Sequence, residues 1–156
     1  MKKRLIAFTT MAALTAFGVY AQDAEDPFAD AVETRHGLML QMASDLGTLG
    51  GMAKGEAAYD KTAATKAAAN VAAIASVISM AQFPAGSENG KSADSYALAD
   101  VWAKQDDFLA KVADLNNAAA AMQTAAATDA DAIKASMAQL GGACSACHKA
   151  YRQPES

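Results

Sequence analysis

Aromatic residues and strand-like patterns are both scarce in this sequence. Aromatic residues make up only 6% of the 156 residues, whereas hydrophobic residues make up 53%, and alanine supplies much of that apolar fraction. We find no convincing strand pattern. Because alanine has the highest helix propensity, the composition favours helices that pack closely around a thin core of small side chains. The length suggests one domain.

The residue sets that usually mark an enzyme are missing as well. The sequence offers no Ser/His/Asp set, no paired-carboxylate site and no loop that could cradle a phosphate. We therefore expect a protein that is not an enzyme.

Residues 1–21 predict a secretory signal peptide. Three basic residues follow the first methionine, an apolar run extends from Leu5 to about Val19, and residues 19–21 resemble a small-residue cleavage site. The apolar run is short for a membrane span, although an uncleaved anchor is the alternative. The mature chain would then be a single domain over residues 22–156, located in the periplasm.

Basic residues are few once that segment is removed. Removing three of the 13 basic residues leaves ten against 17 acidic residues, so the mature chain has a net charge of −7. This charge argues against nucleic acid or an anionic membrane surface as a partner.

The only two cysteines lie in one short motif, Cys144-Ser145-Ala146-Cys147-His148. This C-x-x-C-H pattern attaches a c-type haem: two thiols add across the porphyrin vinyl groups, and the adjacent imidazole binds the iron. On a helix, the two cysteines and the histidine share one face. The motif therefore predicts one haem c, held covalently through two thioethers, with His148 as the iron ligand.

Three other interpretations of the cysteine pair fit less well. A thioredoxin-type site would lie in a βαβ pattern, and no strand is found. A structural zinc site needs four ligands, and only Cys144, Cys147, His148 and His36 could serve. A disulfide between the two cysteines would strain a helix. Haem attachment also agrees with export, because c-type haem is attached in that same compartment in bacteria.

Four helices are expected, joined by short connections and one longer loop. Their signals are Asp26-Pro27 to Gly50-Gly51 for the first, the N-cap Asp60 and about 61–81 for the second, about 97–126 for the third, and Thr128 or Asp129 onward for the fourth. Residues 84–95 form the loop, which is either a plain surface loop or the rim of the cofactor site, with the Tyr96 hydroxyl available to a propionate. This pattern predicts an all-α fold, an antiparallel up-down four-helix bundle.

Each expected helix carries a buried stripe with spacings of three and four residues. The stripes are Phe28, Val32, Arg35, Met39, Met42, Leu46 and Leu49; Ala64, Ala67, Val71, Ile74, Ile78 and Ala81; Val101, Gln105, Phe108, Val112, Leu115, Ala119 and Met122; and Ile133, Met137, Leu140, Cys144, Cys147 and Tyr151. Both cysteines lie on a stripe, which places the haem in the bundle interior. The guanidinium of Arg35 needs an anion or a route to water there. Gly141-Gly142 would let the ring or a neighbouring helix approach closely.

The order and spacing of these motifs resemble the cytochrome c′ family, the class II c-type cytochromes of the bacterial periplasm. The resemblance covers residues 24–152. It is carried by the C-terminal C-x-x-C-H with Ala150-Tyr151-Arg152, Thr34-Arg35 and Met39, Lys54-Gly55-Glu56 with Tyr59-Asp60, Phe83-Pro84-Ala85-Gly86, and Val101-Trp102 with Phe108.

The resemblance implies roles for residues outside the haem motif. Arg35 matches an arginine that lies by a haem propionate, and Met39 matches the residue that covers the distal face of the iron. Arg152 matches a basic residue near the proximal side of His148. His36 departs from the family, which usually has glutamine there; it is either a surface or rim histidine, or a propionate contact or titrating group near the haem edge.

Two functions follow from the resemblance. In the first, the iron is five-coordinate and high-spin, and its apolar distal side favours NO or CO over O₂ while the haem still exchanges electrons. In the alternative, Met39 is a sixth ligand and the protein is a low-spin electron carrier. Arg35 matches the high-spin members better, and methionine is also an ordinary apolar filler. A thiol-redox protein with free cysteines is a third class.

Partners are less defined. The resemblance permits a homodimer through the first two helices, whose exposed faces over residues 27–81 carry many alanines and few charges. A redox partner protein is expected but not identified, and no membrane contact is expected after signal cleavage.

Overall fold

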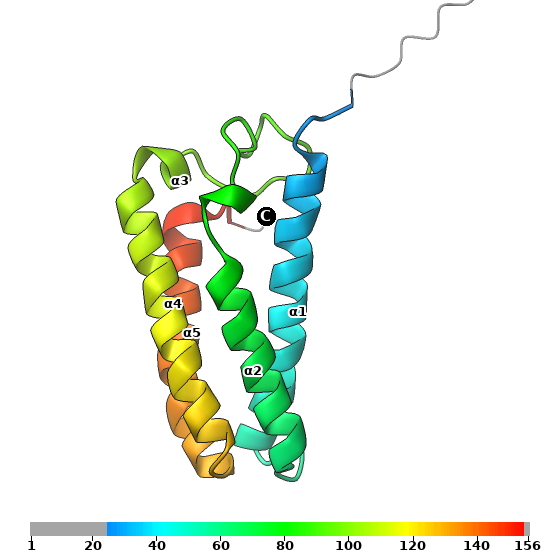
Figure 1. Cartoon of the computed structure of the whole chain (residues 1–156), viewed down its shortest axis with the longest axis vertical. Helices are drawn as coiled ribbons and strands as arrows, with labels where there is room; N and C mark the ends of the chain where they lie inside the picture. Colours follow the sequence, from blue (N-terminus) through cyan, green and yellow to red (C-terminus); the bar gives the residue numbers. More distant parts are fainter. Residues whose placement is uncertain (1–24, 155–156) are drawn as a thin grey trace, which may run out of the picture.

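Four long helices form an antiparallel up-down bundle in the computed structural model, which describes residues 25–154 (Figure 1). They are α1 (Ala29–Ala53), α2 (Lys61–Val77), α4 (Gln105–Ala126) and α5 (Ala130–Tyr151). Two short elements, the 3₁₀ turn η1 (Met80–Gln82) and the single-turn α3 (Asp100–Ala103), flank the loop between α2 and α4. The expected all-α four-helix bundle is confirmed. The predicted signal peptide, residues 1–21, lies outside the described residues.

The helices pack in a closed ring, each against its neighbours. α1 contacts α2, α2 contacts α4, α4 contacts α5, and α5 returns to α1. In Figure 1 the loop after α2 crosses the end of the bundle where α1 begins and α5 ends. Within residues 25–154, no helix has both the length and the apolarity needed to cross a bilayer.

Two aspartate caps define helix starts as expected. The Asp60 carboxylate accepts from the Thr62 and Ala63 amides at the start of α2, and Asp129 accepts from the Ala132 amide at the start of α5. Each cap satisfies backbone donors that have no partner inside the helix.

The expected start of the first helix is wrong by about one turn. α1 begins at Ala29 with Phe28 at the N-cap position, so Pro27 is not its first helical residue. Asp26 accepts from the Phe28 amide, but its other oxygen accepts from Ser92 and Ala93 in the distant loop. Asp26 therefore joins α1 to the loop instead of capping the helix.

Other boundaries also differ from expectation. α1 continues past Gly50-Gly51 to Ala53, and the positive φ of 74° falls at Gly55 instead. The second helix ends at Val77 and is followed by η1, short of the expected residue 81.

The third helix is not continuous over 97–126. Residues 96–98 pair with the end of α5: the Leu98 amide donates to the Tyr151 carbonyl at 2.9 Å, and the Gln153 amide donates to the Tyr96 carbonyl at 2.7 Å. Lys104 then leaves helical geometry, with φ −126° and ψ 44°, and separates α3 from α4. Gln105, expected on the buried stripe, is exposed for this reason. The same pairing holds Gln153 against Tyr96.

Apart from Ala81, which lies in η1 and is exposed, the buried stripes otherwise follow the expected positions. Apolar stripe residues such as Leu49, Val71, Val101, Met122, Ile133 and Leu140 are fully buried. Gly141 and Gly142 are exposed, and nothing lies within 4 Å of where their Cβ atoms would be, so they do not admit a neighbouring helix.

Candidate haem-binding site

One apolar cavity of about 560 Å³ lies between the helices and brings together the residues of the C-x-x-C-H motif. Its size falls within the range of roughly 300–1,000 Å³ that is usual for cofactor pockets. Its lining comes from α1, α4, α5 and residues near Tyr96, and comprises Arg35, His36, Met39, Leu40, Met42, Ala43, Leu46, Ile78, Phe83, Tyr96, Ala97, Val101, Phe108, Lys111, Val112, Leu115, Ala143, Cys144, Cys147, His148, Tyr151 and Arg152. Every site residue predicted from the sequence lines this cavity.

α5 supplies the cysteines and the histidine from one helical face. Cys144 and Cys147 are half-buried, carry free thiols and pack against the hydrophobic core, while His148 follows directly at the more exposed end. The regular helix over residues 130–151 keeps the three side chains on one side, as the spacing requires. The two cysteines therefore face the cavity, and His148 lines it at the exposed end of the motif.

Both thiols sit where burial disfavours the thiolate. Burial raises the pKa of Cys144, and burial together with the neighbouring Cys144 thiol raises the pKa of Cys147 to about 11. Redox-active cysteines instead have lowered pKa values in electropositive, accessible surroundings. The site thus lacks the property that a thiol-redox protein needs.

Arg35 is buried at the end of the cavity and is fully engaged by the loop. One terminal nitrogen donates to the Gln82 carbonyl at 2.9 Å and the Ser87 hydroxyl at 2.8 Å; the other donates to the Ser87 carbonyl at 3.1 Å and the Ser95 hydroxyl at 3.0 Å. Its guanidinium also lies 4.8 Å from the centroid of the Phe83 ring. Neutral oxygens, and not a carboxylate, therefore satisfy the charge that sequence reasoning expected to need an anion or water.

His36, Tyr96 and Arg152 meet at the mouth of the cavity although they come from three separate segments. The ring centroids of His36 and Tyr96 are 6.0 Å apart, and the Arg152 guanidinium carbon lies 5.5 Å from the Tyr96 ring centroid. Tyr96 is 44% exposed, and the other two side chains are half-buried. The backbone pairing of residues 96–98 with 151–153 holds this group together.

Met39 and Met42 line the cavity from α1. Met39 is half-buried and Met42 is almost fully buried, one turn further along the helix. Both present flexible apolar side chains toward the space that the cysteines and His148 face.

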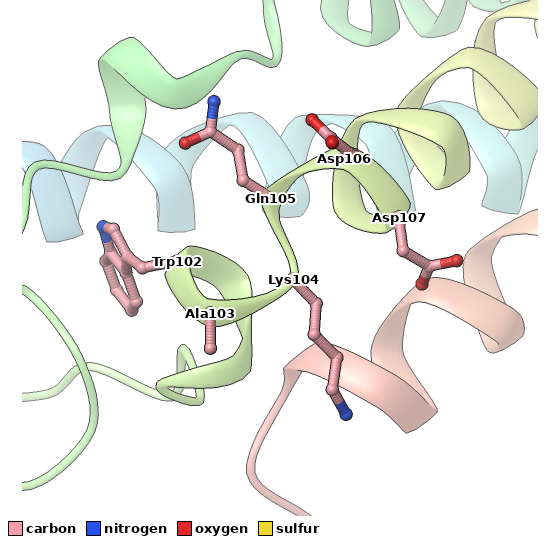
Figure 2. Close-up of a pocket in the computed structure, with 6 residues that line it drawn as sticks. All are labelled: Trp102, Ala103, Lys104, Gln105, Asp106 and Asp107. Atoms are coloured by element: carbon pink, nitrogen blue, oxygen red, sulfur yellow. The ribbon is translucent and has the colours of Figure 1, made fainter.

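Sequence reasoning missed two features of the cavity wall. Lys111 lines the cavity, although no role was predicted for it from its sequence position. It lies three residues after Phe108 on α4, and this spacing is the signal that could have identified it. Tyr151 also lines the cavity, and its hydroxyl donates to the Asp107 carboxylate at 2.5 Å, which raises the pKa of Tyr151 to about 12. Figure 2 shows Asp107 extending toward α5 from the break between α3 and α4.

The break itself forms a second, shallow hollow on the surface. It is lined by Trp102, Ala103, Lys104, Gln105, Asp106 and Asp107 (Figure 2). The Trp102 indole nitrogen donates to the Phe83 carbonyl at 2.9 Å, and its ring packs edge-on to Phe83. Trp102 thus supports the wall of the main cavity from behind.

Comparison with known proteins decides the family. The family model described as Cytochrome C' matches residues 30–152. The chain belongs to the cytochrome c′ family. It is 49% identical to cytochrome c-554 of Cereibacter sphaeroides over 142 residues. This match covers 91% of this chain and 92% of that protein.

Solved structures agree with this assignment. Cytochrome c prime from Shewanella frigidimarina superposes with a TM-score of 0.72 at 34% identity, covering 85% of this chain and 100% of that one. The nitric oxide complex of a single-residue mutant of cytochrome c prime from Alcaligenes xylosoxidans superposes with a TM-score of 0.71 at 28% identity, covering 81% of this chain and 97% of that one.

The site fits the cofactor of the cytochrome c′ family, one covalently bound haem c. Two free thiols and an imidazole share one helical face, and the space before them is large and mostly apolar. Cys144 and Cys147 would form the thioethers and His148 would bind the iron, which supplies one-electron exchange. The basic side chains of Lys111 and Arg152 in the lining suit the two propionates of a haem, whereas Arg35 is already engaged by the loop.

Proposed function

We propose that this cytochrome c′ exchanges electrons and binds NO or CO at an iron held by His148 alone. The observation that carries the proposal is the composition of the cavity wall on α1. Met39, Met42 and Leu46 are apolar, and the four terminal N–H groups of Arg35 are all donated to the loop. His36, the other polar side chain of α1 in the lining, lies at the mouth beside Tyr96. Such a wall gives bound O₂ little hydrogen-bonding help, whereas NO and CO need less.

The NO complex of the Alcaligenes xylosoxidans relative supports this choice of ligand. A single-residue mutant of that protein forms a nitric oxide complex, and its fold covers 81% of this chain. Since the two chains share the bundle fold, we expect a neutral diatomic ligand at an open iron position here.

A second function is favoured by the placement of Met39. Its thioether lines the same cavity as His148 and sits on a flexible side chain. If the sulfur binds the iron, gas access is blocked, the reduction potential rises and the protein is an electron carrier only.

The absorption spectrum of the reduced haem protein, with and without CO, separates the two functions. A broad, unsplit visible band that shifts on CO addition is expected for an open iron. A sharp, split band that does not respond to CO would overturn the first function and establish the second.

Two matched substitutions identify the ligand in that experiment. Met39→Leu keeps the side-chain volume and removes the sulfur, so it leaves an open-iron spectrum unchanged but converts a methionine-ligated spectrum into an open one. Met42→Leu, on the same helix and in the same cavity, is the control and leaves the spectrum unchanged in either case.

We also infer export to the periplasm. The inference rests on the basic and apolar pattern of residues 1–21 and on the free thiols that haem attachment consumes. Mass spectrometry of the purified haem protein from a periplasmic extract should give a chain that begins at Gln22; an intact chain confined to the membrane fraction would contradict it.

A further inference from the structure

The cavity is the positively charged part of an acidic protein. The chain carries 17 acidic and 13 basic residues, yet the part of the cavity lining drawn from residues 25–154 holds Arg35, Lys111 and Arg152 and no aspartate or glutamate. A change of charge inside this cavity therefore interacts most strongly with these cationic side chains. A lining group that gains or loses a proton changes the electrostatic energy of the others.

His36 is the imidazole in the lining that lies outside the haem motif. The sequence contains two histidines, and the other, His148, belongs to the haem motif. Histidine is the side chain whose ordinary titration falls between pH 5 and 8. The family that the sequence resembles usually has glutamine at this position, and glutamine has no titratable group. The imidazole at position 36 therefore distinguishes this chain from most of that family.

Among residues 25–154, the side chains that face the cavity around His36 are cationic or neutral. Arg35 is its neighbour on α1, and Tyr96 and Arg152 meet it at the mouth. Across the cavity, α4 presents Lys111, and α5 presents His148 and the two cysteines. On its own helix, Glu33 lies one turn earlier and is exposed, outside the lining.

We propose that His36 binds a proton when the haem is reduced and releases it when the haem is oxidised, so that this cytochrome c′ couples electron transfer to proton transfer. One electron from an external one-electron donor converts ferric to ferrous iron, and one proton from solvent binds the imidazole. This inference rests on the electron exchange proposed above. Reduction removes one positive charge from the cavity and so strengthens proton binding at His36.

The coupling is reciprocal. If reduction strengthens proton binding, a protonated His36 must stabilise the reduced haem by the same free energy. The reduction potential therefore falls as the pH rises through the titration of His36, and is flat on either side of it.

The test is a spectroelectrochemical titration of the purified haem protein between pH 5 and 8.5. The wild-type potential is expected to fall across this range, and the His36→Gln variant is expected to lose that fall. Glu33→Gln, which alters a charge on the same helix outside the cavity, is the matched control and keeps the wild-type dependence. A His36→Gln variant with the same pH dependence as wild type would overturn the inference and assign the proton to another group, such as a propionate.

A second measurement keeps the inference separable from the proposed function. The imidazole resonances of His36, followed by NMR, are expected to titrate at a higher pH in the reduced protein than in the oxidised one. Identical titrations in a protein that is reversibly reduced overturn the proton coupling alone. A protein that cannot be reversibly reduced overturns the proposed electron exchange, and the coupling with it.

Discussion

Arg35 ties α1 to the loop that closes the end of the cavity. It is 7% exposed, and burial lowers the pKa of its guanidinium, yet four hydrogen bonds to oxygens between Gln82 and Ser95 satisfy it. Ser87 and Ser95 are themselves buried, and the Ser95 hydroxyl also donates to the Ser87 carbonyl at 2.6 Å. Arg35 thus holds three separate points of the loop to a distant helix.

Replacing Arg35 should weaken the fold measurably. Arg35→Met removes the four hydrogen bonds and leaves buried oxygens without donors, so the free energy of unfolding should fall by about 2–4 kcal/mol in chemical denaturation. Lys54→Met is the control, because the Lys54–Glu56 pair is exposed and 3.9 Å apart, and it should change stability by less than about 0.5 kcal/mol. Equal effects from the two variants would contradict the anchoring role.

Asp26 should make stability depend on pH in the acid range. The Ser92 hydroxyl and the Phe28 and Ala93 amides donate to its carboxylate and lower its pKa in the folded state. A lowered folded pKa stabilises the fold above the unfolded value of about 3.9, and this contribution is lost as the pH falls through the folded value. Urea denaturation at pH 7, 4 and 3 should show a smaller acid loss in Asp26→Asn than in wild type, whereas the exposed Asp114→Asn should match wild type.

At the scale of elements, a glycine inside a helix and a glycine in a turn have different roles. Gly142 lies inside α5, is exposed, and has open space where a Cβ would stand. Gly86 lies in the loop with φ +100°, and a Cβ there would be 2.9 Å from two carbons of the Phe28 ring. The same substitution should therefore have opposite effects at the two sites.

Alanine at each glycine tests this directly. Gly142→Ala should raise the free energy of unfolding by about 0.5–1 kcal/mol, because it removes backbone freedom from the unfolded chain. Gly86→Ala should lower it by about 1–3 kcal/mol through backbone strain and the clash with Phe28. Denaturation followed by helical circular dichroism measures both; a destabilised Gly142→Ala would show that close approach at α5 does matter.

At the scale of the whole molecule, the cavity replaces part of a conventional core. Phe83, Phe108 and Tyr151 pack edge-on around it, with ring centroids 4.9 Å and 5.3 Å apart. Alanine contributes much of the rest of the buried surface. A bundle built of small side chains around a large apolar space gains its packing when a cofactor fills that space.

Removing both cysteines should therefore cost stability as well as colour. Cys144→Ala with Cys147→Ala should carry no haem that survives acid-acetone extraction, and its thermal midpoint should fall by roughly 10 °C or more, as a loss of about 3 kcal/mol produces in a domain of this size. Ser145→Ala, between the two cysteines and exposed, should keep both properties. A colourless double variant as stable as its parent would contradict the packing role of the haem.

The sequence alone determined the helical class, the bundle stripes and the haem motif, because each depends on spacing within a single helix. Residues such as Leu49, Leu140 and Cys147 each lie three or four residues from the next member of their stripe. A helix places residues with this spacing on one face, whatever surrounds the helix. The chemistry of C-x-x-C-H is likewise contained in five consecutive residues. These predictions needed no knowledge of how the helices meet.

Only the tertiary structure decided which distant side chains meet. Three contacts join segments that are 47 to 67 residues apart in the sequence. They are the bonds from Arg35 to neutral oxygens, the bonds from the loop to Asp26, and the contacts of Tyr96 with His36 and Arg152. The break at Lys104 has the same origin, since residues 96–98 leave the helix to pair with the end of α5. Local periodicity fixes which face of a helix is buried, but polar and charged groups choose partners by proximity in the folded chain, and that proximity exists only once the bundle has closed.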